Sequence, residues 1–300
     1  MVISSYKNFK SGYVAIVGQP NVGKSTLLNS LLQFKVSSVT RKAQTTRHQV
    51  RGILSGENYQ IVFFDTPGIL EPEYELHKAM LQAVSRSVQD ADVVLFIVAA
   101  SDQHDPYDAG KLGSILAENK KVVLAVNKID RIQKNLLLPL LKFYGETFTL
   151  NSVVPISALK SDGLQQLRNV LVEALPVGVP FYDPADITDH PETFIVSEII
   201  REKIFERYGE EIPYATTVQI DEFTERKSGK DFIRAIIFVE RASQKGILIG
   251  RKGEALQRVG KQARAEIEET LGRGVFLELW VKVKEKWRKD PQSLKEFGYT

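Results

Sequence analysis

The chain has 300 residues, enough for two domains, and its content of 43% hydrophobic and 26% charged residues is typical of a globular protein. No apolar run reaches the roughly 18 residues that a membrane-spanning helix needs, and the polar N-terminus does not resemble a signal peptide. The sequence contains no cysteine, which excludes disulfides and thiolate metal sites and favours a reducing cytoplasm.

The net charge of +3 is distributed unevenly along the chain. Residues 183–225 hold 3 basic and 12 acidic side chains, whereas residues 226–289 hold 17 basic and 8 acidic ones. A cationic segment of this size indicates a polyanionic partner, and the alternative is a solvated surface with scattered lysines.

The first part of the chain alternates apolar strand patterns with amphipathic helix patterns, which predicts an α/β fold with a doubly wound, mostly parallel sheet. The expected strands are residues 13–17, 50–54, 60–64, 92–98, 121–126 and 153–156, the second of them as an antiparallel edge. The expected helices are residues 24–32, 77–90, 106–119, 132–144 and 163–175.

A stretch rich in proline and aspartate follows and ends this pattern. It predicts a domain at 1–178 and another at 193–300, joined by an extended linker at 179–192. The second domain is expected to have the order α-β-β-α-α-β. Its elements are predicted at residues 192–208, 215–223, 231–240, 244–249, 254–271 and 275–283.

The first motif is a phosphate-binding loop of the pattern G-x-x-x-x-G-K-[ST], in which glycines allow backbone N–H groups to approach phosphates. Lys24 is expected to reach the β- and γ-phosphates, and Ser25 to bind Mg²⁺. The nucleotide-binding residues predicted here are Gly18, Gln19, Pro20, Asn21, Val22, Gly23, Lys24, Ser25 and Thr26.

A second motif of the pattern D-x-x-G follows the strand at 60–64 and comprises Asp65, Thr66, Pro67 and Gly68, with Ile69 next to it. Asp65 is expected to hold Mg²⁺ through water, and the Gly68 N–H to meet the γ-phosphate. Thr45 and Thr46 lie between the two motifs, and we expect Thr46 to complete the Mg²⁺ shell. The alternative for this threonine pair is an ordinary polar loop.

Two further motifs indicate which base is bound. Asn127, Lys128 and Asp130 form N-K-x-D after a buried strand, and the Asp130 carboxylate suits the N1 and N2 donors of guanine. Ser157, Ala158 and Leu159 follow the next strand and are expected to support the base through backbone N–H groups. The five motifs in this order predict a site for GTP and GDP.

The catalytic residues expected at this site are Asn21, Lys24, Thr46 and Gly68. Many GTPases orient the attacking water with a glutamine just after D-x-x-G, but Ile69 occupies that position here, which predicts slow intrinsic hydrolysis. Asn21 suggests a substitute, because its side-chain oxygen is suited to holding K⁺ against the phosphates.

The second domain carries a G-x-x-G sequence between two predicted helices, a pattern that clamps single-stranded RNA in KH domains. The predicted RNA-binding residues are Lys245, Gly246, Ile249, Gly250, Arg251, Lys252 and Gly253. The tail at 280–289 alternates tryptophan with basic residues. Base stacking, a final strand with Trp280 in the core, and attraction to anionic lipid are the alternatives for it.

With the motifs GQPNVGKS, KAQTTRH, DTPGI, NKID, SAL and QKGILIGRKGE, the chain resembles the Era family of bacterial GTPases, of the TrmE-Era-EngA-like group, over nearly its whole length. The resemblance implies a C-terminal KH domain of the second type, binding to the 3′ end of 16S ribosomal RNA, and assistance in 30S subunit assembly. It also implies a cytoplasmic protein with some peripheral association with the inner membrane, and a family that lacks the water-orienting glutamine. We expect a monomer.

Two other functions are compatible with the residues. In the first, a membrane-surface signalling GTPase coupled to growth or the cell cycle, the basic C-terminus meets anionic lipid instead of RNA. In the second, a structural RNA-binding protein, GTP is a static ligand.

Overall fold

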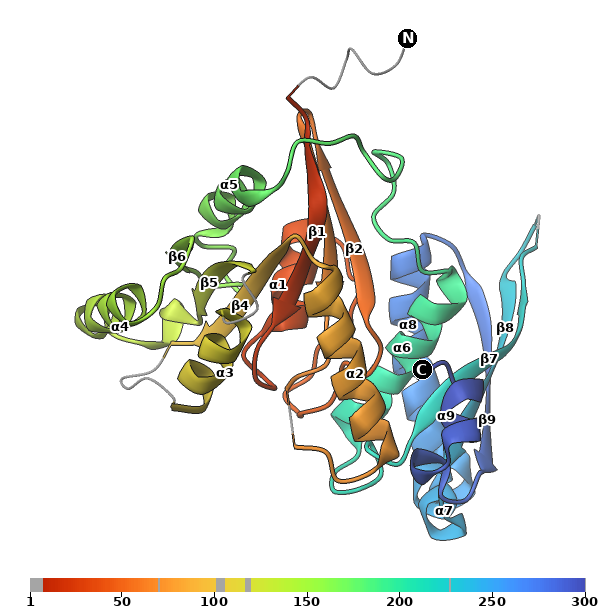
Figure 1. The fold of residues 1–300 in the computed structure, drawn as a ribbon. Helices are drawn as coiled ribbons and strands as arrows, with labels where there is room; N and C mark the ends of the chain where they lie inside the picture. Colours follow the sequence, from red (N-terminus) through yellow and green to blue (C-terminus); the bar gives the residue numbers. More distant parts are fainter. Residues whose placement is uncertain (1–7, 70, 101–105, 117–119, 227, 300) are drawn as a thin grey trace. The chain divides into compact units, whose positions relative to one another are not determined.

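The computed structural model describes residues 8–69, 71–100, 106–116, 120–226 and 228–299, and these form two compact units with one sheet each (Figure 1). The first unit comprises Met1–Ser37, Thr46–Glu71 and Leu81–Asp189, and the second comprises Ser38–Thr45, Pro72–Met80 and His190–Thr300. The division at residue 189 falls inside the predicted linker. Two short segments of the predicted first domain, however, cluster with the second unit.

The sheet of the first unit has six strands in the order β2-β3-β1-β4-β5-β6. Strand β2 pairs antiparallel with β3 at one edge, as predicted, and the other pairs are parallel. The strands are β1 (Lys10–Val17), β2 (Val50–Gly56), β3 (Tyr59–Asp65), β4 (Val93–Ala99), β5 (Lys121–Asn127) and β6 (Ser152–Pro155). The helices are α1 (Lys24–Leu32), α2 (Glu75–Asp90), α3 (Pro106–Leu116), α4 (Lys134–Thr147) and α5 (Leu164–Ala174), with the 3₁₀ turn η2 (Ile129–Arg131). The last three residues of the helix predicted at 106–119 lie outside the described residues.

The central strands of this sheet are buried on both faces, which explains why the sequence shows continuous apolar runs there instead of alternation. Every residue from Val93 to Val98 in β4 is at most 1% exposed, and so is every residue from Val122 to Val126 in β5. The polar motif residues follow the carboxyl ends of these strands, where parallel sheets bind ligands.

The predicted linker is bound to the edge of this sheet over much of its length. The buried Gln60 accepts hydrogen bonds from the N–H groups of Phe181 and Tyr182 at 2.7 and 3.0 Å. The Ile53 N–H donates to the carbonyl of Ile187 at 2.7 Å. These bonds join residues 181–187 to β2 and β3, so this part of the linker belongs to the first unit.

The second unit has a three-stranded sheet in the order β7-β8-β9, with β8 and β9 parallel. Its elements are α6 (Glu192–Arg207), β7 (Thr217–Thr224), β8 (Asp231–Val239), α7 (Ala242–Ile249), η3 (Arg251–Gly253), α8 (Glu254–Leu271), β9 (Val275–Val283), η4 (Trp287–Lys289) and α9 (Pro291–Glu296). The α-β-β-α-α-β order is the predicted one up to β9, and η4 with α9 is an addition.

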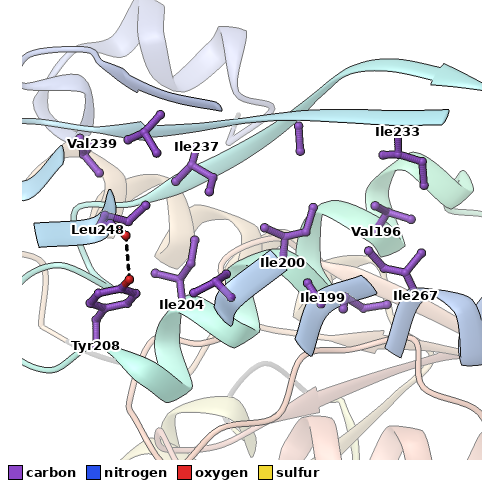
Figure 2. Packing of buried hydrophobic residues seen from close by; sticks show 14 of the residues in the cluster. Val196, Ile199, Ile200, Ile204, Tyr208, Ile233, Ile237, Val239, Leu248 and Ile267 are labelled. Atoms are coloured by element: carbon purple, nitrogen blue, oxygen red, sulfur yellow. Dashed lines mark hydrogen bonds between the residues drawn. The ribbon is translucent and has the colours of Figure 1, made fainter. Parts of the chain in front are cut away.

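One face of this sheet packs against α6 and α8 and forms the core of the unit (Figure 2). Ile233 and Ile237 of β8 meet Ile200 of α6 and Ile267 of α8 in this cluster, and all four side chains are fully buried. Alternate residues of β8 therefore point into the core, and the residues between them lie on the opposite, outer face.

The structure contradicts one of the three interpretations of the tail at 280–289, the one that placed Trp280 in the core. Trp280 is 53% exposed on β9, so it is not a core residue. Trp287 is the buried tryptophan, and its indole N–H donates to the carbonyl of Ala215 at 2.9 Å. Helix α9 went unpredicted although Asp290 caps it and Pro291 begins it, a recognisable start signal. Within the described part of the chain, no helix is both long and apolar enough to cross a membrane.

Candidate guanine-nucleotide site and G-x-x-G loop

The phosphate-binding loop leads from β1 into α1. Gly23 adopts φ +106°, and a Cβ there would lie 2.4 Å from the side-chain nitrogen of Asn127, so only glycine fits. Lys24 begins the helix, is 6% exposed, and donates to the carbonyls of Gly18 and Gln19 at 3.0 and 2.8 Å. Burial lowers the pKa of Lys24 to about 8, against the opposing effect of the Asp65 carboxylate. A nucleotide phosphate at this point would add a further counter-charge to the buried ammonium.

Three predicted Mg²⁺ ligands converge beside the loop. The Ser25 hydroxyl lies 2.8 Å from that of Thr46 and donates to the Asp65 carboxylate at 2.6 Å. Thr45 turns elsewhere, since its hydroxyl donates to the carbonyl of Lys42 at 2.8 Å.

The second carboxylate oxygen of Asp65, Oδ1, is buried and has no hydrogen-bond partner among the residues that the structure describes. Burial raises the pKa of this carboxyl. A divalent cation held by Ser25, Thr46 and Asp65 would satisfy that oxygen and favour the ionised carboxylate. The oxygen-only ligands suit Mg²⁺, so the donor set fits this ion.

The D-x-x-G motif lies directly against the phosphate-binding loop. A Cβ on Gly68 would come within 2.8 Å of Pro20, which requires glycine for this close approach. The Ile69 N–H donates to the carbonyl of Gly18 at 3.2 Å, while its side chain packs on the apolar cluster around β4 and β5. Thr66 is fully buried and donates to the carbonyl of Ile16, so its side chain supports the fold.

Asn127 joins three of the motifs. Its side-chain nitrogen donates to the carbonyl of Val22 at 2.8 Å, and its oxygen accepts from the Ala158 N–H at 2.9 Å. Lys128 adopts φ +66° and its ammonium donates to the carbonyl of Asn21. The N-K-x-D motif therefore holds the phosphate-binding loop and the Ser157–Leu159 segment in place.

Asp130 is exposed and oriented by one neighbour. The Ser157 hydroxyl donates to Asp130 Oδ1 at 2.6 Å, which lowers the pKa of the carboxyl and keeps it ionised at neutral pH. Leu159 is 67% exposed beside it. An open cavity of about 520 Å³ lies next to Asp130 and Ser157. It is lined by Ile129, Asp130, Ile132, Lys134, Leu137, Leu138, Ser157, Lys160 and Asp162.

The G-x-x-G loop of the second unit joins α7 to α8. Gly250 and Gly253 have φ +71° and +82°, and Lys252 between them has φ +51°. Arg251 and Lys252 are exposed, as is Gly246 in α7, whereas Lys245 and Ile249 are half-buried. The buried Leu248 fixes the helix before the loop, because its carbonyl accepts from the Tyr208 hydroxyl at 2.8 Å (Figure 2). The loop thus presents two cations and an open backbone from a rigid base, which suits RNA phosphates.

Sequence reasoning missed a group of polar contacts on α6. The segment Ser38–Thr45 lies in the second unit, where the Val39 N–H donates to Glu202 at 2.8 Å and the Ser38 hydroxyl donates to the carbonyl of Glu198 at 3.1 Å. The Lys42 ammonium donates to the carbonyls at the end of α6, a position where the helix dipole favours a cation. The charged residues inside the apolar pattern of α6 were the available signal.

Comparisons with known proteins agree with this geometry. A family model described as 50S ribosome-binding GTPase matches residues 13–128, and a KH domain model matches residues 211–288. The GTPase Era of Geotalea daltonii is 44% identical over 293 residues, which cover 98% of this chain and 99% of that protein. The GTPase Era of Lacticaseibacillus paracasei is also 44% identical, over 96% of each chain.

Two solved structures match over 97% of this chain at 42% identity. One is Era in complex with MgGDPNP and nucleotides 1506–1542 of 16S ribosomal RNA, with a TM-score of 0.93 and 99% of that chain covered. The other is a single-residue variant of Aquifex aeolicus Era bound to GDP·AlF4⁻, with a TM-score of 0.91 and 100% of that chain covered. With both motif sets in place and relatives matched from end to end, this chain belongs to the Era family of GTPases.

Proposed function

We propose that this GTPase binds the 3′ end of 16S ribosomal RNA through its G-x-x-G loop and assists assembly of the 30S subunit in the cytoplasm. The main support is the similarity over 97% of the chain to Era bound to MgGDPNP and nucleotides 1506–1542 of that RNA. The exposed Arg251 and Lys252, held between two glycines with positive φ, are the residues that would contact the RNA backbone.

For GTP hydrolysis, Lys24 and the backbone N–H groups of the phosphate-binding loop would stabilise the transferred phosphoryl group. Ser25, Thr46 and Asp65 would hold Mg²⁺, which neutralises charge that develops on the phosphates. Ile69 has no group that orients water and packs on an apolar cluster, so intrinsic turnover should be slow.

The proposed role of Asn21 is to supply a site for K⁺ at the phosphates. Asn21 is exposed in the loop with φ +62°, a conformation that asparagine tolerates better than most residues. Steady-state GTP hydrolysis should be faster in K⁺ than in Na⁺ buffer at equal ionic strength, and Asn21→Ala should abolish this difference. Equal rates of the unsubstituted protein in the two buffers would refute the role.

GTP is proposed to act on RNA binding through residues 38–46. Thr46 would be fixed when Mg²⁺ and GTP are bound. The residues just before it hydrogen-bond to α6. Helix α6 packs against the sheet of the second unit, which contains the KH domain and is called the KH unit below. RNA should therefore bind more tightly with a non-hydrolysable GTP analogue than with GDP, and by linkage RNA should tighten GTP binding by the same factor. Equal RNA affinities in the two nucleotide states would refute this switch.

The test of RNA recognition uses Gly253→Asp and a short single-stranded RNA that matches the 16S 3′ end. A Cβ at Gly253 meets nothing within 4 Å, whereas one at Gly250 would lie 2.6 Å from the Ala255 Cβ and disturb α8. Gly272→Asp is the matched control, because Gly272 ends the same helix with φ +67° and open space. Gly253→Asp should lower RNA affinity by roughly tenfold through a carboxylate placed among the phosphates, and Gly272→Asp should not. Similar affinities of the two variants would contradict RNA binding at this loop.

The same pair of variants addresses a peripheral membrane fraction. Binding to vesicles containing phosphatidylserine should be equal for the two variants if general charge is responsible. Vesicle binding combined with no RNA binding would favour the membrane-surface alternative. Sedimentation with and without GTP analogue checks the proposed monomer.

A further inference from the structure

The C-terminal segment covers one half of the outer face of the β7-β8-β9 sheet within the second unit. In that half, Phe238 of β8 packs on Phe297 after α9, with ring centroids 5.0 Å apart. The Thr217 hydroxyl of β7 lies 2.9 Å from that of Tyr299. The C-terminal segment thus protects the end of the face where β8 finishes, whereas Phe276, at the end where β8 begins, is 56% exposed.

Aromatic side chains occupy this second half. Phe232 of β8 and Phe276 of β9 are register partners and their rings stack, with centroids 5.9 Å apart and planes inclined by 14°. Phe276 is 56% exposed, and Trp280 on the same face of β9 is 53% exposed. Aromatic side chains, Phe and Trp among them, are enriched at protein–protein interfaces.

Carboxylates surround the arginine at the centre of this area. Arg234 lies over the Phe232 ring at 5.2 Å, and its guanidinium bonds to Glu278 at 2.9 Å and to Glu222 at 3.1 Å. Asp221 lies 3.7 Å from the same guanidinium. We name Phe232, Arg234, Phe276, Glu278, Trp280, Asp221 and Glu222 the outer-face patch. Its three acidic groups exceed its single cation, and they still outnumber the cations when Lys282, the next exposed residue on the same face of β9, is included. The net negative charge disfavours a phosphate backbone and favours a cationic ligand.

The patch is separate from the G-x-x-G loop. The loop precedes α8, and Val275 of β9 follows its C-terminus after a short turn. With 18 residues, α8 is about 27 Å long. The loop and Phe276 therefore lie at opposite ends of this helix, so RNA held at the loop does not account for the exposure of Phe276. Trp280 points away from α8, because its neighbour Leu279 is the residue of β9 that faces Gly260 of the helix.

We propose that the outer-face patch is a docking surface for a basic protein segment rich in arginine or lysine that carries apolar side chains. The carboxylates would pair with its cations, the exposed rings of Phe276 and Trp280 would take its apolar side chains, and an arginine would stack on Trp280. This partner would be bound in addition to GTP and RNA.

The probe is a short dye-labelled peptide of alternating arginine and leucine, added to the full-length protein and followed by fluorescence anisotropy. A glutamate–leucine peptide of equal length tests the charge requirement, and oligouridylate tests RNA as the ligand. Trp280 fluorescence reports the location, since Trp287 is buried and serves as an internal reference. We expect the basic peptide to bind and to quench Trp280, and its binding to weaken with salt.

The variants are Phe276→Ala and the pair Glu222→Lys with Glu278→Lys. Each variant should lower the affinity of the protein for the basic peptide by roughly tenfold while GTP turnover stays unchanged. Ile247→Ala is the matched control, because Ile247 is 53% exposed in the same unit but belongs to α7, outside the patch. Circular dichroism verifies folding of each variant.

The proposal would be overturned by equal binding of the acidic peptide, by quenching of Trp280 when oligouridylate is added without peptide, or by peptide affinity that is unchanged in Phe276→Ala. An equal loss in Ile247→Ala would also do so, because it would show general attraction of apolar surface.

Discussion

The nucleotide site and the G-x-x-G loop both suit anions, yet they are built in opposite ways. In the nucleotide site, the side chains of Lys24, Asp65 and Asn127 are at most 6% exposed. Each is held by a hydrogen bond to the backbone or the side chain of a residue in the phosphate-binding loop. In the second, Arg251 and Lys252 are exposed on a short turn between two helices. A buried site concentrates the binding energy in single groups, because an interaction in a low dielectric is strong and its loss is not replaced by water. An open loop spreads the energy over several screened contacts.

Lys24→Ala should produce the largest change, and it tests whether the binding energy of the nucleotide site is concentrated in single buried groups. It removes the buried ammonium expected at the phosphates, so kcat/KM for GTP should fall by roughly a hundredfold or more. Turnover assays and calorimetric titration with GDP measure the loss. Lys142→Ala is the control, since Lys142 is an exposed residue of α4 with a weak 3.7 Å pairing to Glu146. Unfolding of the KH unit in Lys24→Ala would show that the two units are not independent.

Asp130→Asn should have the next largest effect and addresses an exposed residue within the nucleotide site. The change inverts the hydrogen-bonding pattern that guanine meets, so GTP affinity should fall on the order of a hundredfold while xanthosine triphosphate gains. Competition between the two nucleotides measures the preference. Asp162→Asn, an isosteric change lining the same cavity, should leave it unaltered. An unchanged base preference in Asp130→Asn would contradict the guanine assignment.

The two halves of the comparison also differ in how much of them the sequence predicts. The phosphate-binding loop and the N-K-x-D motif have fixed spacings because backbone geometry requires them, and the helix expected at 24–32 is α1 as observed. The contacts that join the motifs, such as Asn127 to Val22, depend on the folded sheet and have no local signal. The same holds for the contacts of Val39 with α6, which arise between segments about 160 residues apart.

In the second unit, periodicity predicted every element that packs on the core but not which tryptophan is buried. Trp280 follows an apolar strand residue and Trp287 follows a basic residue, and neither neighbour indicates that Trp287 is the buried one. The burial of Trp287 depends on its contact with Ala215, a residue that is distant in the sequence. Helix α9 is short and amphipathic patterns are weak over so few residues, so its capping residue Asp290 was the stronger indication.

Lys252→Ala should have a small effect on RNA affinity, and it tests whether the binding energy of the G-x-x-G loop is spread over several contacts. One exposed phosphate contact contributes little, so affinity should fall a few-fold and the slope of log K against log salt should decrease by about 0.7. Filter binding over a range of salt concentrations measures both. Lys289→Ala, in the same basic segment but outside the loop, is the control. A fall in RNA affinity as large as the roughly hundredfold loss expected for GTP in Lys24→Ala would show that the loop, too, concentrates its binding energy in single residues.

Asp231→Asn should have the smallest effect and asks whether a buried carboxylate of the second unit, paired with the half-buried Arg273, stabilises this unit through its charge. The Arg273 guanidinium donates to Asp231 at 2.6 Å and lowers the pKa of this carboxyl, with help from the Arg226 N–H. Because the folded pKa is lowered, this stabilisation is present above the unfolded value of about 3.9 and is lost as the pH falls through the folded pKa. The variant should therefore unfold at lower urea concentration than the unsubstituted protein at pH 7, and the difference should shrink in acid. Trp287 fluorescence follows the unfolding of this unit, and Asp221→Asn, at an exposed residue of the same sheet, is the control that should leave the urea midpoint at pH 7 unchanged. A difference between Asp231→Asn and the unsubstituted protein that stays constant down to strong acid would mean that packing, and not the charge of Asp231, stabilises the unit.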